Sequence, residues 1–595
     1  MKYIQRTSHN ITHNFFRELM EDRKIIPPNN EEYYQRFLKP NKMELLDNSS
    51  LLNVDKGVQL LKSHLKKDNL ILIIVDPDVD GFTSSAVMFL YLQIVNRLLE
   101  LNLTIDYLLP DGKEHGLATK VNELINNKKY NLVIIPDAAS NDHDELKMMK
   151  DTGYDTLILD HHEFDRYDEN SIVINNQGGD YENRSLSGVG VVYKFLKSMD
   201  CELDIDYADN FLDLVATGMC SDMMNLNTLE NRYITDQGFK NFRNQGLREI
   251  IKAQAYSLFS KRTEEITDSF LDSIHLTPIQ VAFYIAPLIN ALIRVGTDKD
   301  KEILFKALIQ GDETVPSTKR GHKGEIESVA EQNARNCINA RSRQNREKDK
   351  AIELLDIQIQ DNCLDDNKIL ILNADELNVS NNLTGLVAMG VAAKYKKPVL
   401  LGRTTPDGMY LKGSGRGQNG SELQDFRQFL LDSNLMEYVE GHSNAFGQGI
   451  KISNIDKLYK YANTELANIN FNEGFYEIDF NINANCSYIK ELIFDLWEGR
   501  YIYGQECPEP NILINNLPVN NYSVCGSNKN TLKITFNDIT YIKFKADDLI
   551  DKLSKSKNIT LNVIGRASVN TWGWKQEPQI LITDEEIVED NLFGF

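Results

Sequence analysis

The sequence predicts an α/β protein with a parallel sheet first, then a long connecting helix, a second α/β unit and a small all-β region. Three observations lead to this prediction. Up to about residue 235, short β-branched apolar runs alternate with stretches of helical periodicity, which is typical of βαβ units. Residues 325–355 carry one apolar stripe at helical spacing and contain no Pro or Gly. After about residue 468 the pattern changes to short alternating strands.

Three apolar runs in the first part are expected to form buried strands, at residues 70–75, 132–135 and 156–159. An acidic residue follows each run: Asp76, then Asp137 after a proline, then Asp160. Open α/β sheets bind their ligands just beyond the carboxyl ends of the strands. We therefore expect these three carboxylates to line one crevice.

The remaining elements divide the chain further. The polar, breaker-rich segment 312–324 is expected to be an exposed loop before the long helix. Beyond that helix, strands at 369–372 and 398–401 are expected around a helix at 385–394. The last part contains strand candidates at 533–536, 541–544 and 559–564. The predicted segments are 1–235, 236–355, 356–467 and 468–595.

Composition excludes several classes of protein. Of the 595 residues, 42% are hydrophobic and 26% are charged, which excludes disordered, collagen-like and coiled-coil chains. The longest apolar run is far shorter than the roughly 20 residues that span a bilayer, and the N-terminus lacks a secretory signal, so we expect a cytoplasmic protein without a membrane segment. The seven cysteines form no CxxC pair, which argues against a zinc ribbon or a disulfide framework.

The net charge of −22 would ordinarily count against a nucleic-acid ligand. Residues 394–420 differ from this average, because they hold six basic residues and one acidic residue, a local charge of +5. This stretch is either a set of solvated surface charges or one basic face.

The densest acidic sequence is Asp76-Pro-Asp78-Val-Asp80-Gly81, where a strand gives way to a turn and a helix from about Thr83. Three carboxylates on alternate residues repel one another unless a cation holds them. The alternatives are an Asp-rich turn or helix cap and a metal site. An EF-hand is disfavoured, since Val87 stands where its loop needs a Glu.

Histidines add to this acidic set. Asp160-His161-His162 supplies a carboxylate and imidazoles at the end of another strand, and Asp222 ends the stretch 216–222. Together with Asp137, these side chains can hold two divalent ions bridged by one carboxylate. Mixed Asp and His ligands favour Mn²⁺, with Mg²⁺ as the alternative ion.

These elements, in this order, resemble motifs I to IV of the DHH phosphoesterase superfamily, and more specifically the RecJ-like single-strand-specific DNA exonucleases. Residues 36–40, 187–194, 230–232 and 286–291 support the resemblance. Residues 413–416 and 441–447 look like substrate-binding motifs of the DHH-associated domain, and residues 570–582 are similar to the end of the family's OB-fold. The resemblance thus implies a DHH catalytic domain, a DHH-associated domain and a C-terminal OB-fold in the first, third and fourth segments.

The resemblance also implies roles for single residues. Asp78 and Asp80 would bind different metal ions, with Asp137 as the bridge. His161 and Asp222 would join Asp80 on the second ion, and Asp76 would bind or support a ligand. The implied catalytic residues are Asp137, His162 facing the scissile phosphate, Asp160 orienting the histidines, and Arg294. The implied substrate-binding residues are Lys113, in place of a family arginine, Ser187, Arg294, Ser414, Arg416, His442 and Trp572.

The activity implied is 5′-to-3′ hydrolysis of single-stranded DNA to 5′ mononucleotides in DNA repair or recombination. We expect a monomer, with a single-stranded-DNA-binding protein or a helicase as candidate partners. One alternative is a DHH-family phosphodiesterase acting on short oligonucleotides or small nucleotides, which would share every metal ligand. Another is a scaffold that binds single strands without cutting, which would lack a ligand.

Overall fold

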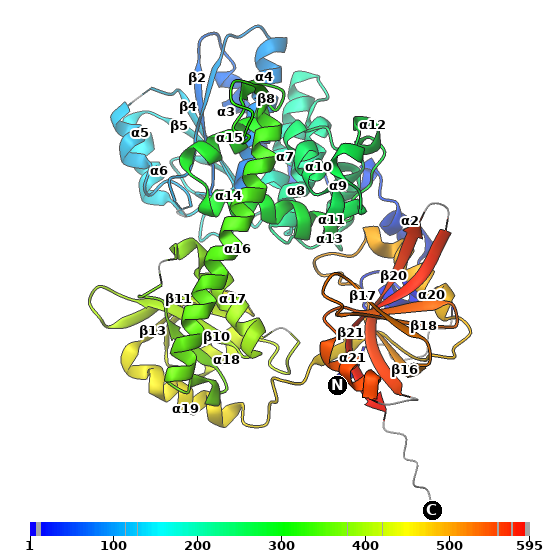
Figure 1. Cartoon of the computed structure of the whole chain (residues 1–595). Helices are drawn as coiled ribbons and strands as arrows, with labels where there is room; N and C mark the ends of the chain where they lie inside the picture. Colours follow the sequence, from blue (N-terminus) through cyan, green and yellow to red (C-terminus); the bar gives the residue numbers. More distant parts are fainter. Residues whose placement is uncertain are drawn as a thin grey trace, which may run out of the picture. The chain divides into compact units, whose positions relative to one another are not determined.

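A computed structural model describes residues 1–6, 13–112, 115–127, 129–377, 379–418, 420–555, 559–572 and 575–588 (Figure 1). The chain divides into two compact units. The parallel-sheet unit comprises Glu31–Gln344 and Tyr501–Pro508. The other unit comprises Met1–Asn30, Asn345–Arg500 and Glu509–Phe595, and we call it the two-sheet unit after its two larger sheets, of five and seven strands. The predicted four-segment division stays a prediction.

The parallel-sheet unit is built on five parallel strands in the order β3-β2-β4-β5-β6. Alternate residues of the central strands enter different cores. Ile71 and Ile134 pack in the core that includes helices α4 (Val79–Leu98) and α7 (Gly188–Leu203), whereas Leu72 and Val133 pack with α5 (Val121–Asn127) and α6 (His143–Thr152). This burial on both faces explains why the strands read as continuous apolar runs. The strands are β2 (Leu70–Ile74), β3 (Thr104–Leu108), β4 (Leu132–Pro136), β5 (Asp155–Asp160) and β6 (Ile172–Asn175).

Most of the helices around this sheet pack into the core that includes α4 and α7. The helices of this part of the unit are α3 (Val54–His64), α4 (Val79–Leu98), α5 (Val121–Asn127), α6 (His143–Thr152), α7 (Gly188–Leu203), α8 (Leu212–Ser221) and α9 (Leu229–Lys240). Helix α4 begins at Val79, not near Thr83 as predicted. Its N-cap is Asp78, which accepts a hydrogen bond from the Gly81 amide at 2.9 Å, so Asp80 lies in the first turn.

Helical residues continue without a break from Pro278 to Val295, through α13 (Pro278–Gln280), the π-helix η5 (Val281–Ile285) and α14 (Ala286–Val295). This 18-residue stretch has a mean hydropathy of 1.5 and could span a membrane by length and composition alone. Half of it is buried inside the structure, as in a core helix of a globular protein.

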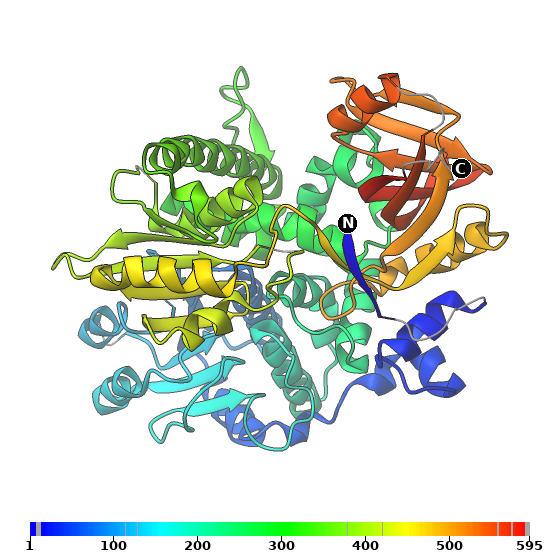
Figure 2. The same cartoon turned by 90° about the horizontal axis from the view of Figure 1, so that it is seen from below.

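The predicted long helix is α16 (Val329–Asp361), shown in green in Figures 1 and 2. It begins four residues after the predicted start, because Ile326–Ser328 form strand β8, which pairs with β7 (Thr314–Pro316). The segment predicted as a loop is therefore part of a two-stranded hairpin. Helix α15 (Asp298–Ile309) precedes this hairpin.

The two-sheet unit contains the second predicted α/β region, a five-stranded sheet in the order β12-β13-β11-β10-β9. Strands β9 and β10 are parallel, and helix α17 connects them, as the apolar runs predict. The elements are β9 (Leu370–Asn373), α17 (Thr384–Tyr395), β10 (Val399–Thr404), β11 (Tyr410–Arg416), β12 (Met436–His442) and β13 (Ala445–Lys451).

The C-terminal region forms a seven-stranded sheet in the order β15-β16-β20-β21-β19-β18-β17. It is not built of strands alone, because helices α20 (Ile489–Glu498) and α21 (Asp547–Lys555) accompany the sheet. Helix α20 buries Ile489, Leu492 and Leu496, which have helical spacing although they lie in a region whose pattern predicts strands. The strands are β15 (Phe480–Asn483), β16 (Ile512–Pro518), β17 (Tyr522–Cys525), β18 (Thr531–Phe536), β19 (Ile539–Lys543), β20 (Thr560–Trp572) and β21 (Lys575–Val588).

Candidate metal centre

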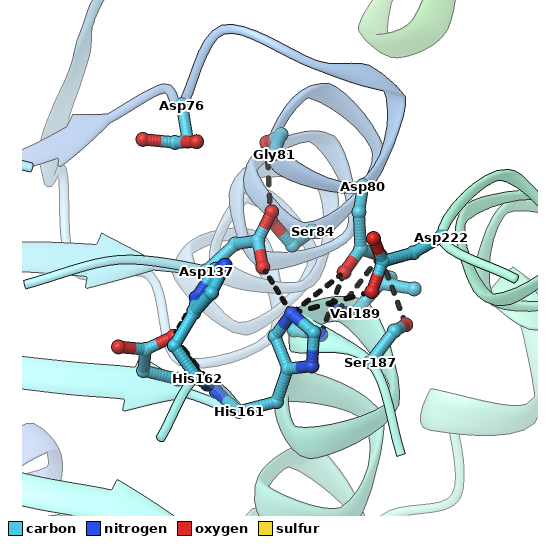
Figure 3. A network of polar contacts seen from close by, with 12 residues as sticks. Asp76, Asp80, Gly81, Ser84, Asp137, His161, His162, Ser187, Val189 and Asp222 are labelled. Atoms are coloured by element: carbon cyan, nitrogen blue, oxygen red, sulfur yellow. Dashed lines mark hydrogen bonds and ion pairs between the residues drawn. The ribbon is translucent and has the colours of Figure 1, made fainter. Parts of the chain in front are cut away.

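The acidic and imidazole side chains singled out in the parallel-sheet unit meet at one edge of its sheet (Figure 3). Asp76, Asp137 and His161 follow β2, β4 and β5, whose carboxyl ends lie side by side because the strands are parallel. Asp80 projects from the first turn of α4, and Asp222 is the C-cap of α8.

His161 lies at the middle of one group of ligands. Its Nε2 atom is 3.2 Å from Asp137 Oδ1, 3.4 Å from Asp222 Oδ2 and 4.0 Å from Asp80 Oδ2. Figure 3 shows the imidazole pointing into the space between these carboxylates. Burial and the nearby charge of His162 lower the pKa of His161 to about 4, so the ring is neutral and can offer a nitrogen lone pair at neutral pH.

The ligand atoms form three overlapping groups, within each of which they lie within 4.8 Å of one another. One group is Asp80, His161 and Asp222, a second is Asp76, Asp78 and Asp137, and a third is Asp137, His161 and His162. Asp137 links the first two groups, because its Oδ1 atom lies 3.2 Å from His161 Nε2. The residues can therefore hold two metal ions that share one carboxylate.

The electrostatics fit this capacity. Burial and the charges of neighbouring carboxylates raise the pKa of Asp80 to about 7 and of Asp222 to about 8, and they raise the pKa of Asp137 well above its usual range. The Oδ1 atom of Asp137 is buried and accepts no hydrogen bond from the described residues. Carboxylates crowded in this way need cations, and oxygen with imidazole nitrogen suits Mn²⁺ or Mg²⁺.

The N-terminus of α7 supports this centre. Asp80 accepts hydrogen bonds from Ser187 Oγ at 2.9 Å, from the Gly188 amide at 2.6 Å and from the Val189 amide at 3.2 Å. Ser187 was predicted to bind substrate, but its side chain is fully buried and donates to Asp80. The residue therefore positions a candidate ligand.

Two glycines that the sequence analysis did not single out lie against the carboxylates. A Cβ atom on Gly188 would lie 2.3 Å from Asp137 Oδ1, and one on Gly218 would lie 2.6 Å from Asp80 Oδ1. Both glycines let helix backbone approach the candidate ligands closely. Gly218 lies four residues before Asp222, and Gly188 lies in the stretch 187–194 that supports the family resemblance, and these positions were the available signal.

Asp160 fixes the second histidine. Burial alone would raise its pKa, but hydrogen bonds hold the pKa of Asp160 at about 2, chiefly the bond from His162 Nδ1 at 2.8 Å. The same bond raises the pKa of His162 to about 9. The His162 side chain is 53% exposed, so a cationic imidazole faces solvent beside the carboxylates in the metal-free protein.

The structure adds His115, which the sequence analysis did not assign. Its Nδ1 atom lies 2.5 Å from Asp76 Oδ2, and the Gly116 amide donates to Asp76 Oδ1 at 3.3 Å. The loop after β3 thus reaches back to the end of β2. Lys113, predicted for this loop as a substrate contact, lies outside the described residues.

Arg294, near the end of α14, brings positive charge to the centre. Burial lowers its pKa, the charge of Asp78 raises it and the charge of Arg341 lowers it. Both groups therefore lie within electrostatic reach of Arg294. The arrangement is consistent with an anion beside the carboxylate cluster.

The other predicted substrate residues lie in the two-sheet unit. Arg416 and His442 flank Ala445 on neighbouring strands, since Ala445 pairs with both. Ser414 Oγ lies 3.4 Å from Thr384 Oγ1 at the start of α17. Trp572 ends β20, and the structure does not describe its side chain.

Several charges of the basic stretch 394–420 are engaged within this unit. Lys394 pairs with Asp356, Lys397 donates to backbone carbonyls, and Arg403 donates to the carbonyls of residues 374, 377 and 379. Of the two alternatives for this stretch, the basic face receives no support from these three residues, whose cations are engaged within the unit. The cations hold loops in place, a role that charge counting does not reveal.

Comparison with known proteins agrees with this architecture. The family model "DHH family, N-terminal domain" matches residues 70–219, and "RecJ OB domain" matches residues 478–584. A Bacillus subtilis (strain 168) protein, named as an SPbeta prophage-derived single-strand DNA-specific exonuclease, YorK, is 35% identical over 561 residues, which is 93% of each chain. The single-stranded-DNA-specific exonuclease RecJ of the same organism is 25% identical over 94% of this chain and 66% of its own.

The solved structures show the same fold. The crystal structure of RecJ in complex with Mn²⁺ from Thermus thermophilus matches with a TM-score of 0.69 and 18% identity, over 98% of this chain and 80% of that one. The Mg²⁺ complex matches with a TM-score of 0.63 and 17% identity, over 98% and 78%. The predicted fold class and resemblance are confirmed, and the chain belongs to the RecJ family of DHH single-strand-DNA-specific exonucleases.

Proposed function

We propose that this protein hydrolyses single-stranded DNA from the 5′ end, releases 5′ mononucleotides and uses two divalent ions, preferably Mn²⁺. The observation that carries the proposal is the adjoining set of ligand groups, in which Asp137 joins Asp76 and Asp78 and also lies 3.2 Å from His161. The exonuclease names of the relatives and the Mn²⁺ and Mg²⁺ complexes of RecJ support the substrate and the cofactor.

The roles of the residues follow from their positions. Asp76 and Asp78 would hold one ion, and Asp80, His161 and Asp222 the other, with Asp137 between them. Two divalent ions bound here would supply Lewis-acid stabilisation of the phosphate and an activated water. Ser187 and the backbone amides of α7 would hold Asp80 in its ligand orientation.

The groups beside the ions would handle the substrate. His162, held by Asp160 and half-exposed, would donate a hydrogen bond to the scissile phosphate. Arg294 would position the strand next to Asp78. Ser414, Arg416, His442, Lys113 and Trp572 are proposed as further substrate contacts.

Activity on small nucleotides is the second candidate, because the metal centre itself is compatible with it. The C-terminal sheet favours the polymer, since OB-folds bind single strands through grooves and aromatic side chains. None of the proposed ligands is missing, which disfavours a scaffold that binds without cutting. We further propose action in repair or recombination, as a cytoplasmic monomer, with a single-stranded-DNA-binding protein or a helicase as partner.

End-labelled substrates test the proposal. Purified protein with Mn²⁺ would be given single-stranded DNA and RNA, with and without a 5′ phosphate, labelled at either end. Release of labelled mononucleotides first from 5′-labelled DNA is expected. Hydrolysis confined to dinucleotides, or starting at the 3′ end, would overturn the proposed substrate or polarity.

A further inference from the structure

The helical stretch from Pro278 to Val295 carries two exposed aromatic side chains that the metal centre does not use. Phe283 is 70% exposed and Tyr284 is 41% exposed, on the π-helix η5. A π-turn inside an α-helix is rare and frequently marks a functional site. Single exposed aromatic rings are common, but two neighbouring rings on a π-turn offer a combined apolar surface that a ligand can cover.

Phe283 begins a stripe of residues that changes from exposed to half-buried along the helix. Phe283, Pro287, Asn290 and Arg294 follow one another at intervals of four, three and four residues, which places them on one helix face. The residues between them, such as Leu288, Ile289 and Leu292, are buried in the core. One side of the stretch packs inside the unit, while the other side is exposed at Phe283 and half-buried from Pro287 to Arg294.

The stripe leads to the metal centre. Asn290 Nδ2 lies 3.5 Å from Ser221 Oγ, and Ser221 directly precedes the candidate ligand Asp222. Arg294 lies within electrostatic reach of Asp78. The axial rise of 1.5 Å per residue puts Phe283 about 16 Å from Arg294 along the helix.

A second cation joins the stripe where it passes the centre. Arg343, on α16, donates to the carbonyl of Val295 at 2.5 Å, which fixes α16 against the end of α14. Arg341, two residues earlier, is near enough to Arg294 for the two charges to interact. Two guanidinium groups close enough for their charges to interact can both attract an anion such as a phosphodiester.

We propose that this stripe is a track for the single strand, in which Phe283 and Tyr284 stack bases and Arg341, with Arg294, holds a backbone phosphate. Exposed aromatics together with cations are the combination by which proteins bind single strands without sequence preference. A strand rises about 3.4 Å per stacked nucleotide, so the rings would meet bases a few nucleotides from the phosphate at the centre. The proposal rests on the proposed function.

Binding and hydrolysis by full-length variants test the track. Phe283→Ala and Tyr284→Ala are expected to weaken binding of a long oligothymidylate about tenfold, because stacking on one aromatic contributes that much. Tyr256→Ala is the matched control, since Tyr256 on α11 (Ala255–Phe259) is 79% exposed in the same unit. Phe283→Trp should keep the wild-type affinity, because an indole ring can also stack on a base.

Substrate chemistry separates stacking from a structural effect. On an oligonucleotide with abasic sites a few positions from its 5′ end, wild type and Phe283→Ala should bind alike. Arg341→Gln should weaken binding and lower the salt slope by about one, with partial rescue by Arg341→Lys. Equal losses for Tyr256→Ala, or a Phe283→Ala defect that persists on the abasic strand, would overturn the track.

The proposed function has a separate readout. If wild type degrades single strands from the 5′ end while Phe283→Ala loses no affinity for them, only the track fails. If wild type hydrolyses dinucleotides alone, the proposed function fails as well.

Discussion

Replacing Ser187 by Ala tests whether the α7 N-terminus tunes the metal centre. Ser187 is fully buried, and its hydroxyl supplies one of the three hydrogen bonds that Asp80 accepts. The substitution removes that bond and leaves the two amide bonds from the backbone. It therefore perturbs the orientation and ionisation of one ligand without deleting the ligand.

A hydrogen bond to a charged group contributes about 1.5–3 kcal/mol, and about 1.4 kcal/mol corresponds to tenfold in an equilibrium constant. Loss of a hydrogen bond behind a metal ligand typically lowers metal affinity about 10–100-fold. We thus expect the Kd for Mn²⁺ to rise by that factor. At saturating Mn²⁺, kcat should return towards the wild-type value, since every ligand remains.

Isothermal titration calorimetry of the metal-free protein with Mn²⁺ measures the affinity, and hydrolysis of end-labelled single strands at increasing Mn²⁺ separates affinity from kcat. Ser198→Ala is the control, because Ser198 lies on the same helix and donates only to the Lys194 carbonyl. The reasoning is refuted if Ser187→Ala leaves the Mn²⁺ requirement unchanged, or if Ser198→Ala shifts it equally.

Three further predictions concern the same centre. Asp137→Ala should abolish hydrolysis, because it removes the carboxylate shared by both ions. It should leave the metal-free fold at least as stable as wild type, because it relieves carboxylate repulsion. More than a few per cent of wild-type activity at saturating Mn²⁺ would contradict the bridging role. Gly188→Ala should lower activity at least about tenfold, since its Cβ would press on Asp137, whereas Gly190→Ala, whose Cβ meets only a leucine side chain, should not. The pKa values of Asp80 and Asp222 are raised to about 7 and about 8, so metal binding must release protons from these groups. The affinity for Mn²⁺ should therefore increase between about pH 6 and 8. Calorimetry in buffers of different ionisation enthalpy measures the proton release, and its absence would contradict the prediction.

The sequence determined the sheet and the identity of the candidate ligands. Apolar runs such as 70–75 and 132–135 predict buried parallel strands, and the acidic residue after each run marks the edge where ligands gather. Both signals are local, because burial on two faces requires a continuous apolar run. The order of the acidic motifs also indicated the family.

Only the tertiary structure decided how these ligands are supported. Whether Ser187 faces a substrate or Asp80 depends on how α7 packs on α4, and the pairing of His115 with Asp76 joins residues 39 positions apart. Capping by Asp78, not periodicity, set the start of α4. The exposure of Phe283 likewise depends on which face of an apolar helix is buried in the core. Long-range packing decides which face is buried, because apolar residues such as Phe283 and Leu288 occur on both faces.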